Sequence, residues 1–310
     1  GNLSLGTGYT LTTNTSTTNT FSGLVIGNGA LTKNGTGWLT LGGNNTYAGA
    51  TTINAGTLEI GAAGRLGGGT YSGNIANTGT FLYSGTNNQI LSGILSGNGS
   101  FAHNAASTLT LTGNNTYSGD TTIYAGTVEI GAAGRLGAGN YTGNIANTGT
   151  LIYSGTNNQT LSGVISSVGA LTQNASSTLT LTGNNTYTGT TTINAGTIQI
   201  GAAGLLGSGN HTGNIVNNGT FIYSGTNNQT LGGILSGTGA LTQNAASTLT
   251  LTANNTYSGT TTISAGTIEI AAAGRLGAGN YSANITNNGV LIYSGTNNQT
   301  LGGIISGTGA

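Results

Sequence analysis

The chain has 310 residues, with only four Lys or Arg, four Asp or Glu, 60 Gly, and no Pro, Cys or Met. A net charge of zero removes the electrostatic basis for binding nucleic acid or anionic lipid. The lack of Cys excludes disulfides and thiolate metal sites. Disorder needs low hydrophobicity with high net charge, and the apolar residues here favour strands, so we expect an all-β fold.

A 70-residue repeat organises the chain. The segment Gly1 to Thr20 shows no signal peptide, and no apolar run approaches the roughly 20 residues of a membrane helix. After a partial copy at 1–30, full copies follow at 31–100, 101–170, 171–240 and 241–310. We expect one continuous solenoid over 1–310. No capping segment is visible, so we expect this solenoid to be a fragment of a longer protein.

Each copy contains three strand units. Leu31–Leu41, Ile53–Ile60 and Ile75–Tyr83 each begin with an apolar residue, turn at Asn and Gly, and then place apolar residues at alternate positions. Alternation with period two predicts strands with one buried face. Such strands cannot bury that face alone, so the coils must stack. We expect a core of Leu39, Leu41, Ile53, Leu58, Ile60, Ile75, Phe81, Tyr83, Leu91 and Ile94, with their equivalents 70 residues on.

The predicted fold class is therefore a right-handed parallel β-helix, or β-solenoid, with about three coils per 70-residue copy. Three units in a copy give about 23 residues per coil, which places stacked repeats in the usual size range. In one copy we divide the coils at Thr51–Gly73, Asn74–Gly99 and Ser100–Asp120. Equivalent residues of successive copies should lie in one row along the axis.

Few side chains offer chemistry. Glu59, Glu129 and Glu269 share one repeat position, so we expect them at least about 14 Å apart along the axis. Paired carboxylates in glycosidases lie within about 5–10 Å of each other. Asp120 and His103 have no acidic or basic partner in view. We therefore assign no catalytic, cofactor-binding or metal-binding residue, and we expect no enzyme activity and no cofactor.

His211 stands where the other copies have a tyrosine, and we interpret it as a substitution of a surface ring. Glutamate and arginine vary together. Three copies have both, and the third copy has Gln199 and Leu205 in their places. This joint change favours a pair of neighbouring surface side chains, with coincidence between near-identical copies as the alternative. The pairs are Glu59 with Arg65, Glu129 with Arg135, and Glu269 with Arg275.

Two surface features suggest binding. The Asn-Asn-Thr-Tyr segments place one tyrosine in each copy, either as an exposed row suited to sugars or proteins, or folded down over a corner. These residues are Tyr47, Tyr117, Tyr187 and Tyr257. Thr-Thr-Ile and Leu-Thr-Leu-Thr segments form a flat uncharged face of the kind that binds ice, but they occupy only about one coil in three.

The stretch from Ser107 to Gly131 resembles the passenger-associated transport repeat of Gram-negative autotransporters. Similar segments occur at Trp38–Gly61, Thr178–Gly201 and Thr248–Ala271, and the strands between them resemble autotransporter-associated strands. The resemblance implies a β-helical passenger exported to the outer cell surface and held there by a C-terminal membrane anchor. Passengers of this family include adhesins, proteases and esterases whose activities lie on insertions, and no copy here carries one.

Repetition, the family segments and the scarcity of reactive side chains favour a structural or adhesive stalk of a secreted bacterial surface protein. The alternative is an extracellular filament or matrix protein whose coils join end to end. A glycan-binding or ice-binding solenoid is a third interpretation. The expected partners are further copies of the chain or a host or neighbouring cell surface, protein or glycan. Nucleic acid is not expected, and a membrane is reached only through an anchor outside this sequence.

Overall fold

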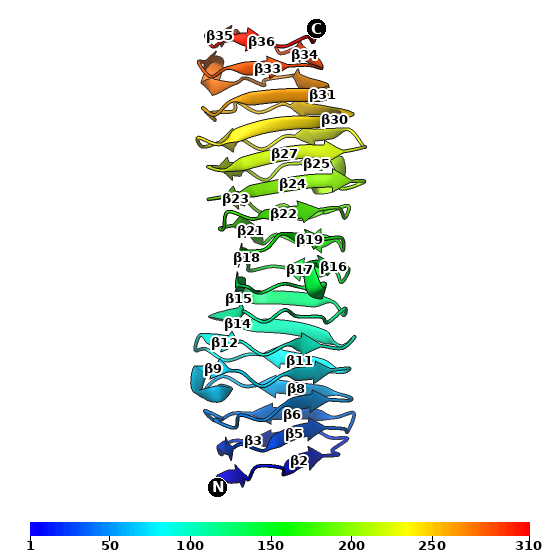
Figure 1. Ribbon diagram of the computed structural model, residues 1–310, viewed down its shortest axis with the longest axis vertical. Coiled ribbons are helices and arrows are strands. Elements are labelled where there is room, and N and C mark those ends of the chain that lie inside the picture. The colour runs from blue at the N-terminus through cyan, green and yellow to red at the C-terminus, as the bar shows by residue number, and fades with distance from the viewer. The chain divides into compact units, whose positions relative to one another are not determined.

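The computed structural model describes all 310 residues, and they form two compact units, Gly1–Asn157 and Asn158–Ala310. Each unit consists of short strands and four-residue-or-shorter helical turns, and successive strands lie above one another in chain order (Figure 1). The strands pair in parallel, as in β5 with β7 and β24 with β27. This arrangement confirms the predicted parallel β-solenoid. None of its helical segments is long and apolar enough to span a membrane.

The first unit contains the strands β1 to β18 and two 3-10 turns. Their bounds are β1 Leu3–Leu5, β2 Thr10–Thr13, β3 Asn19–Phe21, β4 Val25–Gly27, β5 Ala30–Lys33, β6 Trp38–Leu41, β7 Thr51–Ile53, β8 Thr57–Ile60, η1 Gly67–Gly69, β9 Thr70–Tyr71, β10 Ile75–Asn77, β11 Thr80–Tyr83, β12 Gln89–Leu91, β13 Leu95–Ser96, β14 Ser100–Leu111, β15 Thr121–Ala132, η2 Gly137–Gly139, β16 Asn140–Tyr141, β17 Ile145–Asn147 and β18 Thr150–Gly155.

The second unit contains the strands β19 to β36 and two further 3-10 turns. Their bounds are β19 Gln159–Leu161, β20 Ile165–Ser166, β21 Ala170–Gln173, β22 Thr178–Leu181, β23 Thr191–Ile193, β24 Thr197–Ala202, η3 Gly207–Gly209, β25 Asn210–His211, β26 Ile215–Asn217, β27 Thr220–Gly225, β28 Gln229–Leu231, β29 Leu235–Ser236, β30 Ala240–Leu251, β31 Thr261–Ile270, η4 Gly277–Gly279, β32 Asn280–Tyr281, β33 Ile285–Asn287, β34 Val290–Tyr293, β35 Thr300–Leu301 and β36 Ile305–Ser306.

The coils alternate between a short and a long form. Leu31 pairs with Thr51, 20 residues on, whereas Thr51 pairs with Ile75, 24 residues on. The added residues lie in the glycine-rich turn that contains η1 (Gly67–Gly69). The next coil is short again, because Ile75 pairs with Leu95. The glycine-rich segment of each copy is thus a structural turn that lengthens one coil.

Copies in the first unit are displaced from one another by one side of the coil. Phe101 is the equivalent of Leu31 one copy later, but it does not lie in the column of Leu31. It pairs instead with Phe81, whose column runs back through Leu58 to Leu39 on the next side of the coil. A 70-residue copy is therefore three coils and part of a fourth.

The second unit repeats this displacement. Leu171 pairs with Thr191, whereas its equivalent Leu241 pairs with Phe221 in the column of Leu179. The expectation that equivalent residues of successive copies form one row is therefore wrong. The reason is the length of the coils, which average fewer residues than the 23 expected, so that 70 residues overshoot three of them.

The predicted core residues are buried, with the exception of Ile94. Ile94 is 38% exposed, and its neighbour Leu95 takes the interior position. The chain turns here at Gly93, where an added Cβ would lie 2.2 Å from the carbonyl oxygen of Gly73 in the coil below. The N–H of Ile94 is held outward by the Asn74 side chain at 2.8 Å. This turn shifts the inward-facing position by one residue relative to the predicted alternation.

A buried asparagine fixes one corner in each copy. The Asn45 side chain accepts the N–H of Val25 at 3.0 Å, and it donates to the carbonyls of Gly43 and Arg65 at 2.7 and 3.2 Å. These bonds join three successive coils, because the partners lie about 20 residues to either side. The amide therefore satisfies backbone groups that the corner would leave unpaired. Asn115, Asn185 and Asn255 are buried at the equivalent positions.

Candidate functional site

The tyrosines of the Asn-Asn-Thr-Tyr segments are interior side chains. Tyr47 is 0% exposed, and its hydroxyl shares a hydrogen bond of 2.7 Å with Thr51 Oγ1. Thr51 Oγ1 is also 2.7 Å from the hydroxyl of Tyr71, which donates to the carbonyl of Gly49. Burial raises the pKa of Tyr71 to about 12, so both phenols stay neutral. The hypothesis of an exposed binding row is wrong, and the alternative of a ring folded into the corner is confirmed.

His211 interrupts this hydroxyl chain in the third copy. It occupies the position of Tyr71 and is 0% exposed, so its interpretation as a surface ring is wrong. The Tyr187 hydroxyl still reaches Thr191 Oγ1 at 2.7 Å, but neither ring nitrogen of His211 has a hydrogen-bond partner. Burial lowers the pKa of His211 to about 4. The ring is therefore a neutral core side chain at pH 7, and it has no proton-transfer partner.

A second polar position inside each copy holds a turn. Lys33 is fully buried, and its Nζ donates to the carbonyls of Gly35 and Ala55. Its equivalent His103 places Nε2 2.9 Å from the carbonyl of Ser107, and Gln173 donates to the same carbonyl one copy on, Ser177 O, at 2.8 Å. Burial lowers the pKa of both Lys33 and His103. These side chains bind backbone, and their chemistry is spent on the turn.

The predicted glutamate–arginine pairs are absent. Glu59 Oε2 accepts hydrogen bonds from Trp38 Nε1 at 3.0 Å and Thr40 Oγ1 at 2.8 Å, and no ion pair joins it to Arg65. The two residues lie on different sides of the coil, since Glu59 pairs with Leu82 and Arg65 forms a bridge with Asn44. Their joint loss in the third copy has no explanation in the contacts.

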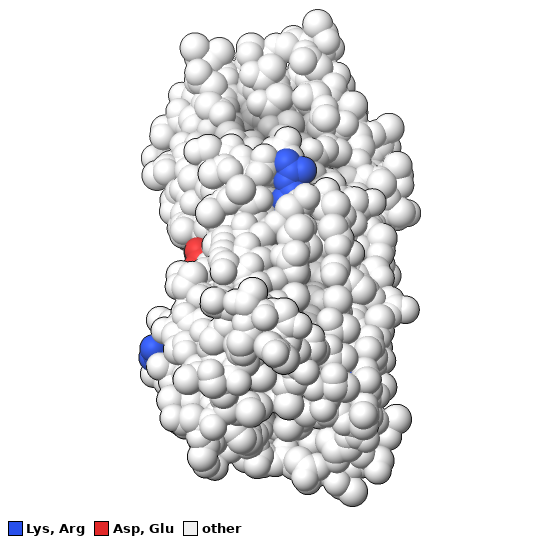
Figure 2. Space-filling view, turned by 60° about the horizontal axis from the view of Figure 1, so that its bottom comes forward, with Lys and Arg blue, Asp and Glu red and all other residues white.

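The carboxylates do not lie in one row either. Glu59 shares a column with Leu82 and Ala102, whereas Glu129 pairs with Thr110 on another side of the coil. No three His, Asp or Glu side chains gather where they could hold a metal ion. The face in Figure 2 carries only isolated charged side chains among uncharged ones.

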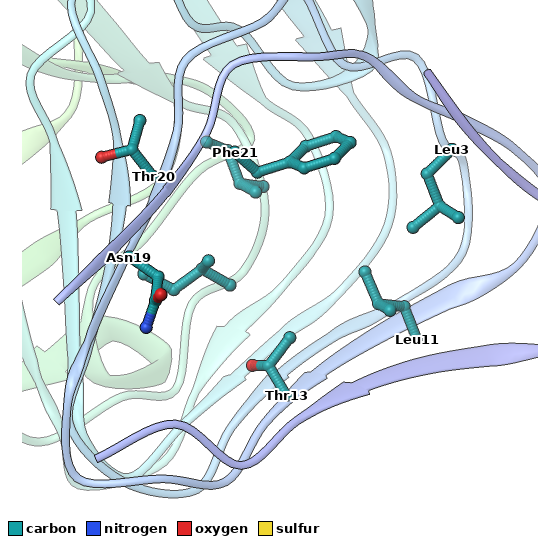
Figure 3. A pocket seen from close by; sticks show the side chains of 8 residues that line it. Leu3, Leu11, Thr13, Asn19, Thr20 and Phe21 are labelled. Carbon is teal, nitrogen blue, oxygen red and sulfur yellow. The ribbon is translucent and has the colours of Figure 1, made fainter. Parts of the chain in front are cut away.

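One hollow lies at the first coil of the first unit. It encloses about 320 Å³ and is lined chiefly by apolar side chains. Figure 3 shows Leu3, Leu11 and Phe21 directed into the same space. Phe21 pairs with Leu41, which is a buried core residue, so the hollow continues the interior column of the solenoid. It is core surface with no polar group arranged for a ligand.

A second hollow lies on the outer surface of the first unit. It encloses about 440 Å³ and is lined by Trp38, Thr57, Thr80, Leu82, Ala102, Asn104 and Tyr124. We call these seven residues the outer groove. Trp38 and Tyr124 are 38% and 58% exposed, and they stand at its two ends. Sequence reasoning missed this site, although Trp38 is the single tryptophan of the chain and replaces a threonine of the other copies.

The fold and its surface define a repetitive parallel β-solenoid whose polar interior groups serve its own corners. Comparison with known families identifies the repeat: residues 31–60, 106–130, 171–200 and 241–270 match the Passenger-associated-transport-repeat. The chain thus carries autotransporter passenger repeats, as the resemblance implied.

One curated relative is the Adhesin BmaC autotransporter of Brucella suis biovar 1 (strain 1330), 38% identical over 195 residues. That alignment covers 50% of this chain and 6% of the relative, so the chain corresponds to a small part of that protein. No solved structure matches. The repeats and the relative together indicate an extracellular location at the outer cell surface.

Proposed function

We propose that this chain is a non-catalytic section of an autotransporter passenger that acts as an adhesive β-helical stalk. One observation carries the proposal: in every copy the buried polar side chains bind backbone or one another at the corners, while hydroxyl and amide groups cover the outside. Such a molecule offers a stiff, uncharged surface with extensive parallel hydrogen bonding. The relative named as an adhesin supports an adhesive role.

The proposal includes one continuous solenoid over residues 1–310. Stacked coils rise about 4.8 Å each, so a copy of slightly more than three coils adds about 16 Å to the length. Removing residues 101–240, which are two full copies, should shorten the particle by about 32 Å in solution scattering or electron microscopy. An unchanged length contradicts the stalk.

Adhesion is tested by displaying residues 1–310 on a non-adherent Gram-negative host through an unrelated membrane anchor. Cells carrying the chain should attach to epithelial cells or to one another, and cells carrying the anchor alone should not. Equal attachment by both refutes the adhesive role. End-to-end assembly is the alternative, and it predicts that purified chains lengthen with rising concentration. Particles of constant length at all concentrations rule that alternative out.

A further inference from the structure

Two aromatic residues depart from the repeat at different positions. Trp38 stands where the other copies have Thr108, Thr178 and Thr248. Tyr124 stands where they have asparagine or serine, namely Asn54, Asn194 and Ser264. An alignment of the copies gives no reason to connect the two departures, because they lie at unrelated points of the 70-residue unit.

The displacement between copies brings them together. Trp38 pairs with Thr57 and Thr57 with Thr80, and the same side continues through β14 (Ser100–Leu111) to the strand that contains Tyr124. The first-copy equivalent of Tyr124 is Asn54, which bonds to Asn34 on another side. Tyr124 therefore reaches the side of Trp38 only because its copy starts one side later. Four coil steps of about 4.8 Å separate the two rings, about 19 Å along the axis.

The floor between the two rings is low and apolar. It is made of Leu82 and Ala102, which are paired neighbours on adjacent coils and are almost completely buried. Ala102 is a further departure from the repeat, since the other copies have threonine at this position. The smaller side chain removes a hydroxyl and a methyl group from the floor. Thr57, Thr80 and Asn104 add hydroxyl and amide groups along the groove.

Trp38 is held in place before any ligand arrives. Its indole Nε1 donates to Glu59 at 3.0 Å, and Glu59 is itself fixed by the Thr40 hydroxyl at 2.8 Å. A ring with a fixed orientation loses less conformational entropy when it binds. In the third copy the corresponding positions are Thr178, Thr180 and Gln199, so this aromatic anchor is specific to the first copy.

These features suit one class of ligand. Flat aromatic rings pack against the C–H faces of pyranose rings, while hydroxyl and amide groups bond to sugar hydroxyls. No cation lines the groove, and the carboxylate of Glu59 lies beside it, so an anionic ligand is disfavoured. A volume of about 440 Å³ fits a small or linear ligand, whereas a stable protein interface buries roughly 800 Å² on each partner.

We propose that the outer groove binds an uncharged linear oligosaccharide lying along the solenoid axis, with sugar rings packed on Trp38 and Tyr124. The proposal rests on the proposed function only in that this side must face outward from the cell. It gives the adhesive stalk a ligand class. It also limits the site to the first unit, because all seven groove residues belong to Gly1–Asn157.

The single tryptophan provides the assay. The full 310-residue chain is titrated to about 5 mM with uncharged hexasaccharides of glucose, mannose and N-acetylglucosamine, while Trp38 fluorescence is recorded. We expect a saturable change with at least one of them. An oligogalacturonate of equal length should bind at least about tenfold more weakly, because of Glu59.

The variants use residues that the repeat itself supplies. Trp38→Thr and Tyr124→Asn restore the residues of other copies, so the chain should fold, which circular dichroism verifies. Each should weaken binding about tenfold or more by calorimetry. The matched control combines Trp38→Thr with Thr178→Trp, which keeps one tryptophan but moves it away from Tyr124. Its fluorescence should not respond to the same sugars.

The possible results separate clearly. No response to any uncharged hexasaccharide, equal binding by the control, or tighter binding of the oligogalacturonate overturns the proposal. Loss of cell attachment in the Trp38→Thr variant without any sugar response points to a protein ligand and also overturns it. A silent titration with unchanged attachment refutes the groove alone, whereas failed attachment by the wild-type chain refutes the adhesive stalk.

Discussion

Replacing His211 by tyrosine should stabilise the second unit. Three copies have a tyrosine here, and in the first its hydroxyl lies 2.7 Å from Thr51 Oγ1. The histidine instead leaves two buried ring nitrogens without partners. One recovered hydrogen bond contributes about 1 kcal/mol, and each unpaired buried polar group costs about 1–3 kcal/mol. We therefore expect a gain of about 1–3 kcal/mol at pH 7.

Acid should enlarge the difference. The folded pKa of His211 is about 4, below its ordinary value of 6.5, so the unfolded chain binds more protons between these values. The free energy of unfolding therefore falls as the pH drops through this window. The loss is about 2 kcal/mol between pH 7 and pH 4.5, and about 3 kcal/mol below pH 4. A buried tyrosine stays neutral throughout, so the variant should lose this part of the acid sensitivity.

Hydrogen exchange with mass spectrometry measures the effect locally, which suits a solenoid whose coils need not unfold together. Amides of β25 and β28 are compared with those of β9 and β12 in the same molecule, at pH 7 and pH 4.5, after correction for intrinsic exchange rates. In the wild type the third copy should lose more protection in acid than the first. The reciprocal variant Tyr71→His should transfer this sensitivity to the first unit. Equal protection in wild type and His211→Tyr at both pH values refutes the reasoning.

Three further substitutions test interior and backbone contributions. Lys33→Gln should stabilise the first unit by about 1–3 kcal/mol at pH 7, because a buried charge without a carboxylate is replaced by the amide of the other copies. Since burial lowers the folded pKa of Lys33, wild-type stability should rise as pH approaches 10.5, and the variant should lack this rise in denaturant titrations. Asn45→Ala should cost about 2–4 kcal/mol by the same titration, whereas the exposed neighbour Asn44→Ala should change little. Ser167 has a positive φ of 78° where other copies have glycine, so Ser167→Gly should stabilise by about 1 kcal/mol, and a lower melting temperature contradicts this.

The sequence predicted the strands and nearly all of the core, because alternation of apolar residues follows directly from the strand period. Its failures have a common cause. Tyr47, Lys33 and His211 were placed outside or left unassigned because their neighbours in sequence are polar. In the structure they fill corners, where the backbone turns and leaves carbonyls and hydroxyls that need partners inside. Alternation describes straight segments and gives no information about these corners.

The arrangement of copies could not be read from the repeat length. That length is visible in the sequence, but the number of residues per coil depends on how the turns close, as in the longer coil that contains η1. A small error in coil length changes which residues of successive copies face the same way. The predicted rows of tyrosines and glutamates failed for this reason, and so did the glutamate–arginine pairs.

The same displacement decides how such a protein can build a local surface. If equivalent residues stacked directly, one substitution repeated in each copy would create a continuous strip. Because Phe101 lies in the column of Leu39 and not of Leu31, repeated substitutions are instead distributed over different sides of the coil. A compact site requires different positions to change in neighbouring copies. Trp38 and Tyr124 show this pattern, so in this chain the departures from the repeat, mapped through the strand register, locate a candidate site that the repeat itself conceals.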